Sequence, residues 1–300
     1  MRWWHAGGKY PAGYVMTHHH EVLEDLLRQP RALRKQIPEV HRGFAALSGA
    51  GRIRSGGLSI PASRKRDASL IWSYGGFMTG EPLDPSLLVV AYPADEFPLS
   101  SAVAVMLAVD DLTTSHEVFA VPPERFVRAT DQSTVLHQRF YDAVSKGFPL
   151  YEAFARWVLA SLAENEPVYL QRIPNLRLQL PDNTAVGEFH RDSDYGHPDG
   201  ELNVWVPLTS CERTSTIWVA PDKDSESARP WILHVGEALR FDGRNLLHGN
   251  VPNTTGATRV SLDFRYLPCR KLEAPLLRTV NTGMRFSPGD YYFSDPIMPS

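Results

Sequence analysis

The chain has few of the features that mark special classes of protein. It contains only two cysteines, Cys211 and Cys269, and neither belongs to a Cys-x-x-Cys pair, which argues against a zinc ribbon or a redox motif. We interpret both as reduced thiols of a cytosolic protein. No apolar run is long enough for a transmembrane helix, and the N-terminal stretch lacks the apolar core of a signal peptide. The sequence therefore predicts a cytoplasmic protein with no membrane partner.

An excess of charge of either sign is also missing. The 300 residues include 31 Lys and Arg against 34 Asp and Glu, which gives a formal net charge of -3. Such a balance provides no global attraction for nucleic acid or for an anionic membrane. The chain is 43% hydrophobic and 22% charged, which is ordinary for a globular protein, and it contains no internal repeat. Its length suits one large domain, or a core with a helical extension.

Helical periodicity is the main pattern in the first half. It predicts a helix over Glu21–Gln29 that ends at Pro30, a second over Ser133–Lys146, and a third that begins at Pro149. The last two helices are expected to buttress a sheet. Residues 51–66 are rich in Gly, Ser and Arg, and they form either a solvated loop or a basic lid over an anionic substrate.

From about residue 166 the pattern changes to short β-type runs separated by Pro, Gly, Asn and Asp. About eight closely spaced strands favour a sandwich or a jelly-roll barrel. We therefore expect a helix-rich extension over 1–165 within the same domain as a β core over 166–300. The predicted strands are Val168–Ile173, Leu176–Leu180, Leu202–Leu208, Thr214–Ala220, Trp231–Val235, Ala238–Phe241, Leu246–Gly249 and Thr258–Tyr266.

A metal-binding pattern lies in this second half. His190 and Asp192 are two residues apart, so in an extended segment both side chains point to the same side. His248 supplies a second imidazole several strands later. Two histidines and one carboxylate on one face form the ligand set of mononuclear non-haem Fe(II) oxygenases, which leaves neighbouring positions open. Taken alone, His-x-Asp is a weak signal, because a histidine on a strand is often a hydrogen-bonded structural residue.

The last predicted strand adds a second signal. Strand alternation places Arg259, Ser261, Asp263 and Arg265 on one face and only apolar or aromatic residues on the other. A polar face with two arginines inside a barrel is explained if it meets an anion, because arginine binds a carboxylate with a two-pronged fork. We predict that Arg259 and Ser261 bind a carboxylate; the alternative is a solvent-exposed edge strand.

In combination, His190-x-Asp192, His248 and Arg259-x-Ser261 resemble the motif of the 2-oxoglutarate/Fe(II)-dependent dioxygenase superfamily. Within it the chain is similar to the phytanoyl-CoA dioxygenase-like branch, over residues 170–268. Two runs resemble the streptomycin-biosynthesis-type oxygenases of aminoglycoside antibiotic clusters: His190-Arg191-Asp192-Ser193-Asp194-Tyr195-Gly196-His197 and Asn203-Val204-Trp205-Val206-Pro207-Leu208-Thr209.

The resemblance implies a mainly β fold with flanking helices around a double-stranded β-helix core of the jelly-roll or cupin type. It implies Fe(II) held by His190, Asp192 and His248, with 2-oxoglutarate and O₂ as co-substrates and Arg259 and Ser261 on the distal carboxylate. The implied activity is oxidation of a C–H bond in a small polar metabolite of bacterial secondary metabolism, such as an aminoglycoside precursor, a sugar or a nucleoside. Hydroxylation is the first expectation, and desaturation, epimerisation and oxidative ring closure are alternatives.

Further candidate residues surround this motif. Gln179, Asn203 and Trp205 are expected to bind the metal-bound end of 2-oxoglutarate, with core packing as the alternative for Trp205. The candidates for substrate contact are Asp194, Tyr195, His197 and Arg265, although the loop residues among them could instead brace the loop with hydrogen bonds.

Three other functions are weighed against this one. A halogenase of the same superfamily lacks the metal carboxylate, which is present here as Asp192. A nucleic-acid-directed or protein-directed oxygenase is a second alternative, although the charge balance argues against nucleic acid. The third is a non-enzymatic jelly-roll binding protein that uses zinc or no metal; His5, the run His18-His19-His20, His197 and His234 could supply other metal sites.

Overall fold

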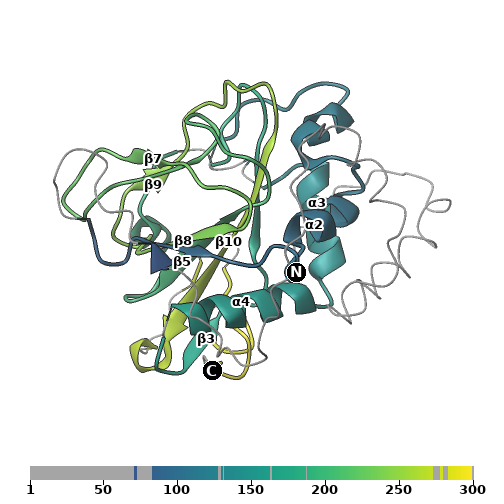
Figure 1. Cartoon of the computed structure of the whole chain (residues 1–300). Helices are drawn as coiled ribbons and strands as arrows, with labels where there is room; N and C mark the ends of the chain where they lie inside the picture. Colours follow the sequence, from purple (N-terminus) through teal and green to yellow (C-terminus); the bar gives the residue numbers. More distant parts are fainter. Residues whose placement is uncertain are drawn as a thin grey trace, which may run out of the picture.

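The computed structural model describes residues 71–72, 83–127, 130, 132–162, 164–186, 188–272, 278–279 and 283–298. Helices α2, α3 and α4 lie together on one side of a large β-sheet, and strands β7 and β9 lie on its other side (Figure 1). The expectation of a mainly β fold with flanking helices is confirmed. Within the described residues, no helix has the length and apolar character needed to cross a bilayer.

The three helices follow from local sequence signals. Helix α4 (Pro149–Ser161) begins with proline at its first turn, where the missing N–H costs nothing, and it buries one apolar face. Helix α3 (Val135–Val144) begins after Thr134, whose hydroxyl accepts from a backbone N–H of the first turn. Both were predicted from the sequence. Helix α2 (Leu99–Leu107) was not; it follows Pro98 and ends at Ala108.

The large sheet has seven strands, all paired antiparallel. Its order is β1-β2-β8-β5-β10-β3, and β4 also pairs with β10. A smaller sheet has the order β7-β6-β9. The strands are β1 (Ile71–Trp72), β2 (Leu88–Ala91), β3 (Val168–Leu170), β4 (Asn175–Gln179), β5 (Leu202–Pro207), β6 (Ile217–Val219), β7 (Arg229–Trp231), β8 (Glu237–Phe241), β9 (His248–Gly249) and β10 (Arg259–Pro268).

Each of the eight predicted strand regions contains a strand, from β3 to β10. For β7 the prediction was Trp231–Val235, but the strand is Arg229–Trp231, so the two share only Trp231. The apolar run continues after Trp231, whereas the pairing with β6 ends there. Strands β1 and β2 come from the half in which only helices were predicted. The predicted helix over Glu21–Gln29, the loop over 51–66, His5 and the run His18-His19-His20 lie outside the described residues.

Strand β10 runs through the middle of the large sheet, and all ten of its residues are buried. Its apolar residues Val260, Leu262, Phe264 and Tyr266 belong to the core under the helices, where Tyr151 of α4 contacts Phe264 edge to face. Alternation therefore turns the polar residues of β10 to the opposite side, toward the space between the two sheets. The candidate residues Arg259, Ser261 and Arg265 are on this polar side.

Candidate metal centre

His190 and His248 are directly paired through their backbones. Each N–H donates to the other's carbonyl oxygen at 2.9 Å, which forms an isolated antiparallel bridge. His248 lies on β9, whose neighbour β6 fixes it in the small sheet. Residues paired in this way carry their side chains on the same side of the sheet, and the two rings are 4.4 Å apart between centroids. The fold thus brings together two imidazoles that are far apart in the sequence.

Backbone carbonyls set the protonation pattern of both rings. The Nδ1 atom of His190 lies 3.0 Å from the carbonyl oxygen of Glu188, and that of His248 lies 2.9 Å from the carbonyl oxygen of Leu246. Because a carbonyl only accepts, each Nδ1 carries the hydrogen and each Nε2 keeps its lone pair. Burial lowers the pKa of His248 to about 4, so its ring is neutral near pH 7. Both histidines therefore present Nε2 as a metal ligand.

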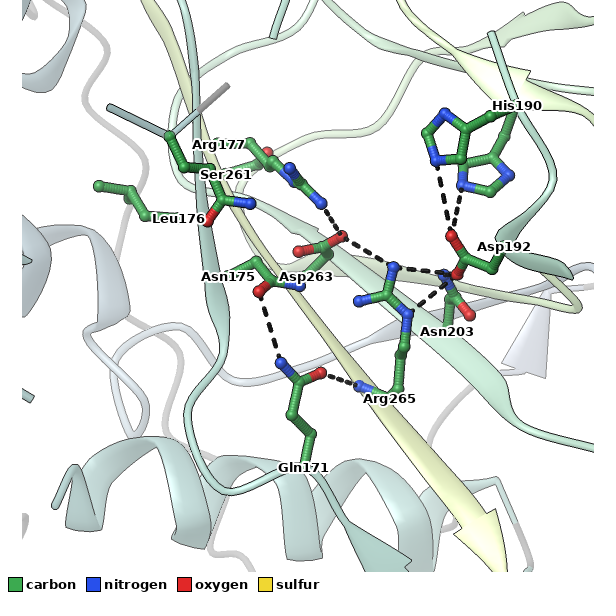
Figure 2. A network of polar contacts seen from close by, with 12 residues as sticks. Gln171, Asn175, Leu176, Arg177, His190, Asp192, Asn203, Ser261, Asp263 and Arg265 are labelled. Carbon is green, nitrogen blue, oxygen red and sulfur yellow. Dashed lines mark hydrogen bonds and ion pairs between the residues drawn. The ribbon is translucent and has the colours of Figure 1, made fainter. Parts of the chain in front are cut away.

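Asp192 completes the group. Its Oδ1 lies 3.5 Å from Nε2 of His190 and 3.7 Å from Nε2 of His248. Its Oδ2 accepts hydrogen bonds from Asn203 and Arg265 on the large sheet (Figure 2). Burial alone raises the pKa of this carboxyl, but Arg265, His197 and His190 together hold it well below its usual range. Asp192 is therefore an ionised carboxylate with one oxygen directed at the two imidazoles.

These three residues fit a metal ion. One ligand atom from each lies within 4.8 Å of the others, and among the residues that the structure describes no other such group of His, Cys, Asp or Glu occurs. His197 and His234, weighed above as alternative ligands, belong to no cluster there. Two neutral nitrogens and one carboxylate oxygen, without a thiolate, form the donor set typical of mononuclear non-haem Fe(II) sites.

Arg259 forms a second polar centre on the same face. The side chain is 1% exposed, and it donates to the Ser215 carbonyl oxygen at 2.9 Å, to Oγ of Ser261 at 2.7 Å and to Oε1 of Gln179 at 2.9 Å. None of these acceptors is charged, and burial lowers the pKa of the guanidinium to about 10. The side chain thus remains a cation at pH 7, without a carboxylate partner in the described part of the chain.

Three of the five N–H groups of Arg259 are used in these bonds, one on each nitrogen. Within the described residues, one N–H on each of Nη1 and Nη2 has no hydrogen-bond acceptor, and a carboxylate can accept from both nitrogens. The ring of Trp205 lies 5.5 Å from the guanidinium carbon. Arg259 is therefore a candidate binding residue for an anion.

This chain is similar in sequence to a known protein. No protein-family model matches the chain. It is 39% identical over 201 residues to the streptomycin biosynthesis protein StrG of Streptomyces griseus, which covers 67% of this chain and 94% of StrG. The chain belongs to the StrG family. The resemblance to streptomycin-type proteins drawn from its motifs is thereby confirmed.

Solved structures are more distant from this StrG-family chain. AviO1 from Streptomyces viridochromogenes Tue57 is 18% identical with a TM-score of 0.41, over 62% of this chain and 92% of AviO1. The non-heme alpha ketoglutarate dependent carbocyclase SnoK, from nogalamycin biosynthesis, is 12% identical with a TM-score of 0.41, over 64% of this chain and 82% of SnoK. At these TM-scores neither neighbour decides the fold or the function of the StrG-family protein.

The structure places the three residues predicted for the metal-bound end of 2-oxoglutarate in different surroundings. Gln179 lies opposite Arg259 across β4 and β10, and its Nε2 donates to two backbone carbonyls, so it holds Arg259 and does not reach toward the histidines. Asn203 donates to Asp192. Trp205 packs in the apolar core between the sheets and against Arg259, and core packing was the alternative weighed for it.

The candidate substrate residues are also mainly engaged with the protein. Asp194 accepts from the backbone N–H of Arg191 and caps the short 3-10 helix η4 (Asp192–Tyr195). His197 is buried and paired with Glu201. Tyr195 packs its ring on His190 at 4.9 Å, and its hydroxyl donates to Glu188. For Asp194 and His197 the structure therefore shows the alternative, loop-bracing interactions, whereas Tyr195 lies beside a candidate metal ligand.

Sequence reasoning did not single out Glu201. It is 1% exposed, and it binds His197 on one oxygen and the hydroxyl of Tyr292, at 2.6 Å, on the other. The only local signal for Glu201 was its position, directly before the apolar strand β5 and four residues after His197. Its remaining partners, Arg265 and Tyr292, come from distant segments.

Proposed function

We propose that this protein is an Fe(II)- and 2-oxoglutarate-dependent oxygenase that oxidises a C–H bond of a small polar metabolite. The observation that carries the proposal is the convergence of two Nε2 atoms and one carboxylate oxygen on a single point. His190, Asp192 and His248 would hold the metal through one face and leave the opposite side for a co-substrate and O₂. When bound, Fe(II) with 2-oxoglutarate and O₂ supplies the oxidation and yields succinate and CO₂.

Arg259 is proposed to bind the distal carboxylate of 2-oxoglutarate. Its buried charge has only neutral acceptors, and an anion would compensate it. Ser261 and Gln179 orient the guanidinium, and Trp205 excludes water from one of its faces. A co-substrate with a carboxylate at each end, one for Arg259 and one at the metal, suits a site with these two centres.

The two sheets are proposed to form the double-stranded β-helix of such oxygenases, with residues 166–300 as catalytic core and residues 1–165 as an extension that buttresses it. The metal group supports this, because His248 comes from the small sheet whereas Asn203 and Arg265, which bind Asp192, come from the large one. The site would then lie between the two sheets.

The proposed substrate is a metabolite of antibiotic biosynthesis, such as an aminoglycoside precursor, a sugar or a nucleoside. The support is the relationship to StrG, which is named for streptomycin biosynthesis. We propose hydroxylation as the reaction, in the cytoplasm; desaturation, epimerisation and ring closure would use the same residues and differ in how the substrate is held.

The test is the formation of succinate from 2-oxoglutarate by purified protein with Fe(II) and O₂, in the presence of a panel of aminocyclitols, sugars and nucleosides. We expect turnover that Asp192→Ala abolishes. The matched control is Asp199→Ala, which removes an exposed carboxylate paired with Lys271 and should keep turnover. Unchanged turnover in Asp192→Ala would refute the metal assignment. Tight metal binding without succinate formation would support the non-enzymatic alternative.

A further inference from the structure

The ion pair between Arg265 and Asp192 has an unusual geometry. An arginine that pairs with a carboxylate commonly places two N–H groups on the two carboxylate oxygens. Here Nε and Nη2 of Arg265 both lie 2.9 Å from the same atom, Oδ2 of Asp192. Nδ2 of Asn203 donates to this oxygen as well, at 2.8 Å. Two hydrogen bonds, from Nε of Arg265 and from Asn203, and the ion-pair contact of Nη2 thus converge on Oδ2, and Oδ1 is left facing the two histidines.

We infer that Arg265 is a positioning residue for the metal ligand. It holds Asp192 so that only Oδ1 can ligate, and it does so before a metal ion arrives. Since Oδ2 already accepts hydrogen bonds from Asn203 and from Nε of Arg265, chelation of the ion by both carboxylate oxygens would require these bonds to break. The inference rests on the proposed metal site and specifies how its carboxylate is set.

The position of Arg265 is itself fixed from several directions. Its backbone N–H donates to Oε1 of Gln171 at 3.0 Å, and its carbonyl oxygen accepts from the backbone N–H of Gln171 at 2.8 Å. The guanidinium lies 3.9 Å from Glu201 and 3.9 Å from Asp263, the latter bound in turn by Arg177 (Figure 2). Glu201 is held by Tyr292 near the C-terminal end of the described chain. The arginine therefore has little freedom to move.

The charges around Arg265 suit a divalent cation. Three buried carboxylates, Asp192, Glu201 and Asp263, lie around the guanidinium of Arg265 in a region of low dielectric constant. Without Arg265 the carboxylate of Asp192 would lose the strongest of the interactions that favour its ionised form. The arginine thus keeps the site assembled when it is empty, and still leaves it attractive to a metal ion.

The test is the binding of Co(II) to purified apoprotein, measured by anaerobic calorimetry and by the visible spectrum of the bound ion, which reports its coordination. We expect the wild type to bind one Co(II) per chain. Arg265→Met should weaken binding 10- to 100-fold, as is usual when a residue that orients a metal ligand is lost, and should change the spectrum because both oxygens can then ligate. Arg265→Lys, with one donor retained, should fall between the two.

Arg240→Met is the matched control. Arg240 is a half-buried arginine that also pairs with a carboxylate, Glu164, but it lies on the helix side of the large sheet. Its loss should lower stability and leave the Co(II) dissociation constant and spectrum unchanged. Should Arg265→Met fail to fold, Asn203→Ala removes one donor to Oδ2 without removing a charge, and we expect a weaker effect of the same kind.

The two proposals can fail separately. The metal-site assignment is refuted if the wild type binds no Co(II), or if His190→Ala and His248→Ala bind it as the wild type does. The positioning role of Arg265 is then refuted as well. If the wild type binds Co(II), the histidine variants do not, and Arg265→Met and Arg265→Lys match the wild type in dissociation constant and spectrum, only the positioning role is overturned.

Discussion

Oε1 of Gln179 accepts a hydrogen bond of 2.9 Å from Nη2 of Arg259, a buried guanidinium whose acceptors in the described structure are all uncharged. This relationship leads to the first prediction. Arg259→Lys should raise the dissociation constant of 2-oxoglutarate about 10- to 100-fold, because an ammonium cannot form the two-pronged fork and charged hydrogen bonds are each worth about 1.5–3 kcal/mol. The measurement is calorimetric titration of the metal-loaded protein under anaerobic conditions.

Metal affinity provides the control for Arg259. Arg259→Lys should bind Co(II) as tightly as the wild type, because Arg259 has no contact with His190, Asp192 or His248. An unchanged affinity for 2-oxoglutarate would assign the distal carboxylate to another cation.

The alternation along β10 shows how far the sequence alone could lead. Polar and apolar residues strictly alternate from Arg259 to Tyr266, and the pattern correctly identified the face that packs in the apolar core under the helices. The same pattern put Arg265 on the opposite face but could not say that it binds Asp192. That contact depends on the pairing of β10 with β5 and on the loop before η4, which are tertiary features.

Other parts of the fold depend even more on distant partners. Strand β2 is a short apolar run, Leu88–Ala91, which by itself is equally compatible with a helix; its strand conformation comes from pairing with β8. Glu201 was missed for a related reason. Its neighbours in sequence give no hint that Tyr292 and Arg265 converge on it from the C-terminal half.

Metal binding should stabilise the protein by mass action. At a Co(II) concentration of about 100 times the dissociation constant, the free energy of unfolding should rise by about 2.7 kcal/mol, provided that the unfolded chain does not bind the ion. Differential scanning fluorimetry should show a higher Tm with Co(II), and excess EDTA should reverse it. His248→Ala should lose this rise in Tm, whereas His234→Ala, which removes an exposed histidine outside the cluster, should keep it. A rise of equal size in both variants would contradict the proposed site.

Gly243 tests how tightly Asn203 is held against Asp192. A Cβ atom at Gly243 would lie 2.5 Å from Nδ2 of Asn203, the atom that donates to Oδ2 of Asp192. Gly243→Ala must therefore displace the amide. We expect it to cost about 1–3 kcal/mol of stability, as overpacking usually does, and to weaken Co(II) binding.

A double-mutant cycle separates this clash from a general effect on the loop. In an Asn203→Ala background the obstructing side chain is gone, so Gly243→Ala should cost clearly less stability there than in the wild type. Urea unfolding of the four proteins gives the coupling energy. Strictly additive effects would mean that the contact between these two residues does not cause the loss.

His137 predicts a specific dependence of stability on pH. It is 1% exposed on α3, with its Nδ1 paired to the Thr134 hydroxyl at 2.8 Å, and burial, followed by the charge of Arg177, lowers its pKa to about 3. The unfolded chain takes up this proton near pH 6.5 whereas the folded protein does not take it up until about pH 3. Because the unfolded state binds the extra proton in that window, stability falls as pH decreases through it, by up to about 1.4 kcal/mol per pH unit.

Urea unfolding at pH 7, 6 and 5 measures this slope. Other groups also titrate in the range, so the comparison is between proteins and not between pH values. His137→Gln should be less stable than the wild type at pH 7, because the ring's packing against Phe126 is lost, and its stability should fall less steeply below pH 6. His234→Gln, an exposed histidine, should keep the wild-type slope. Parallel curves for the wild type and His137→Gln would show that His137 is protonated in the folded protein near neutrality. That result would refute the assignment of a buried, neutral ring.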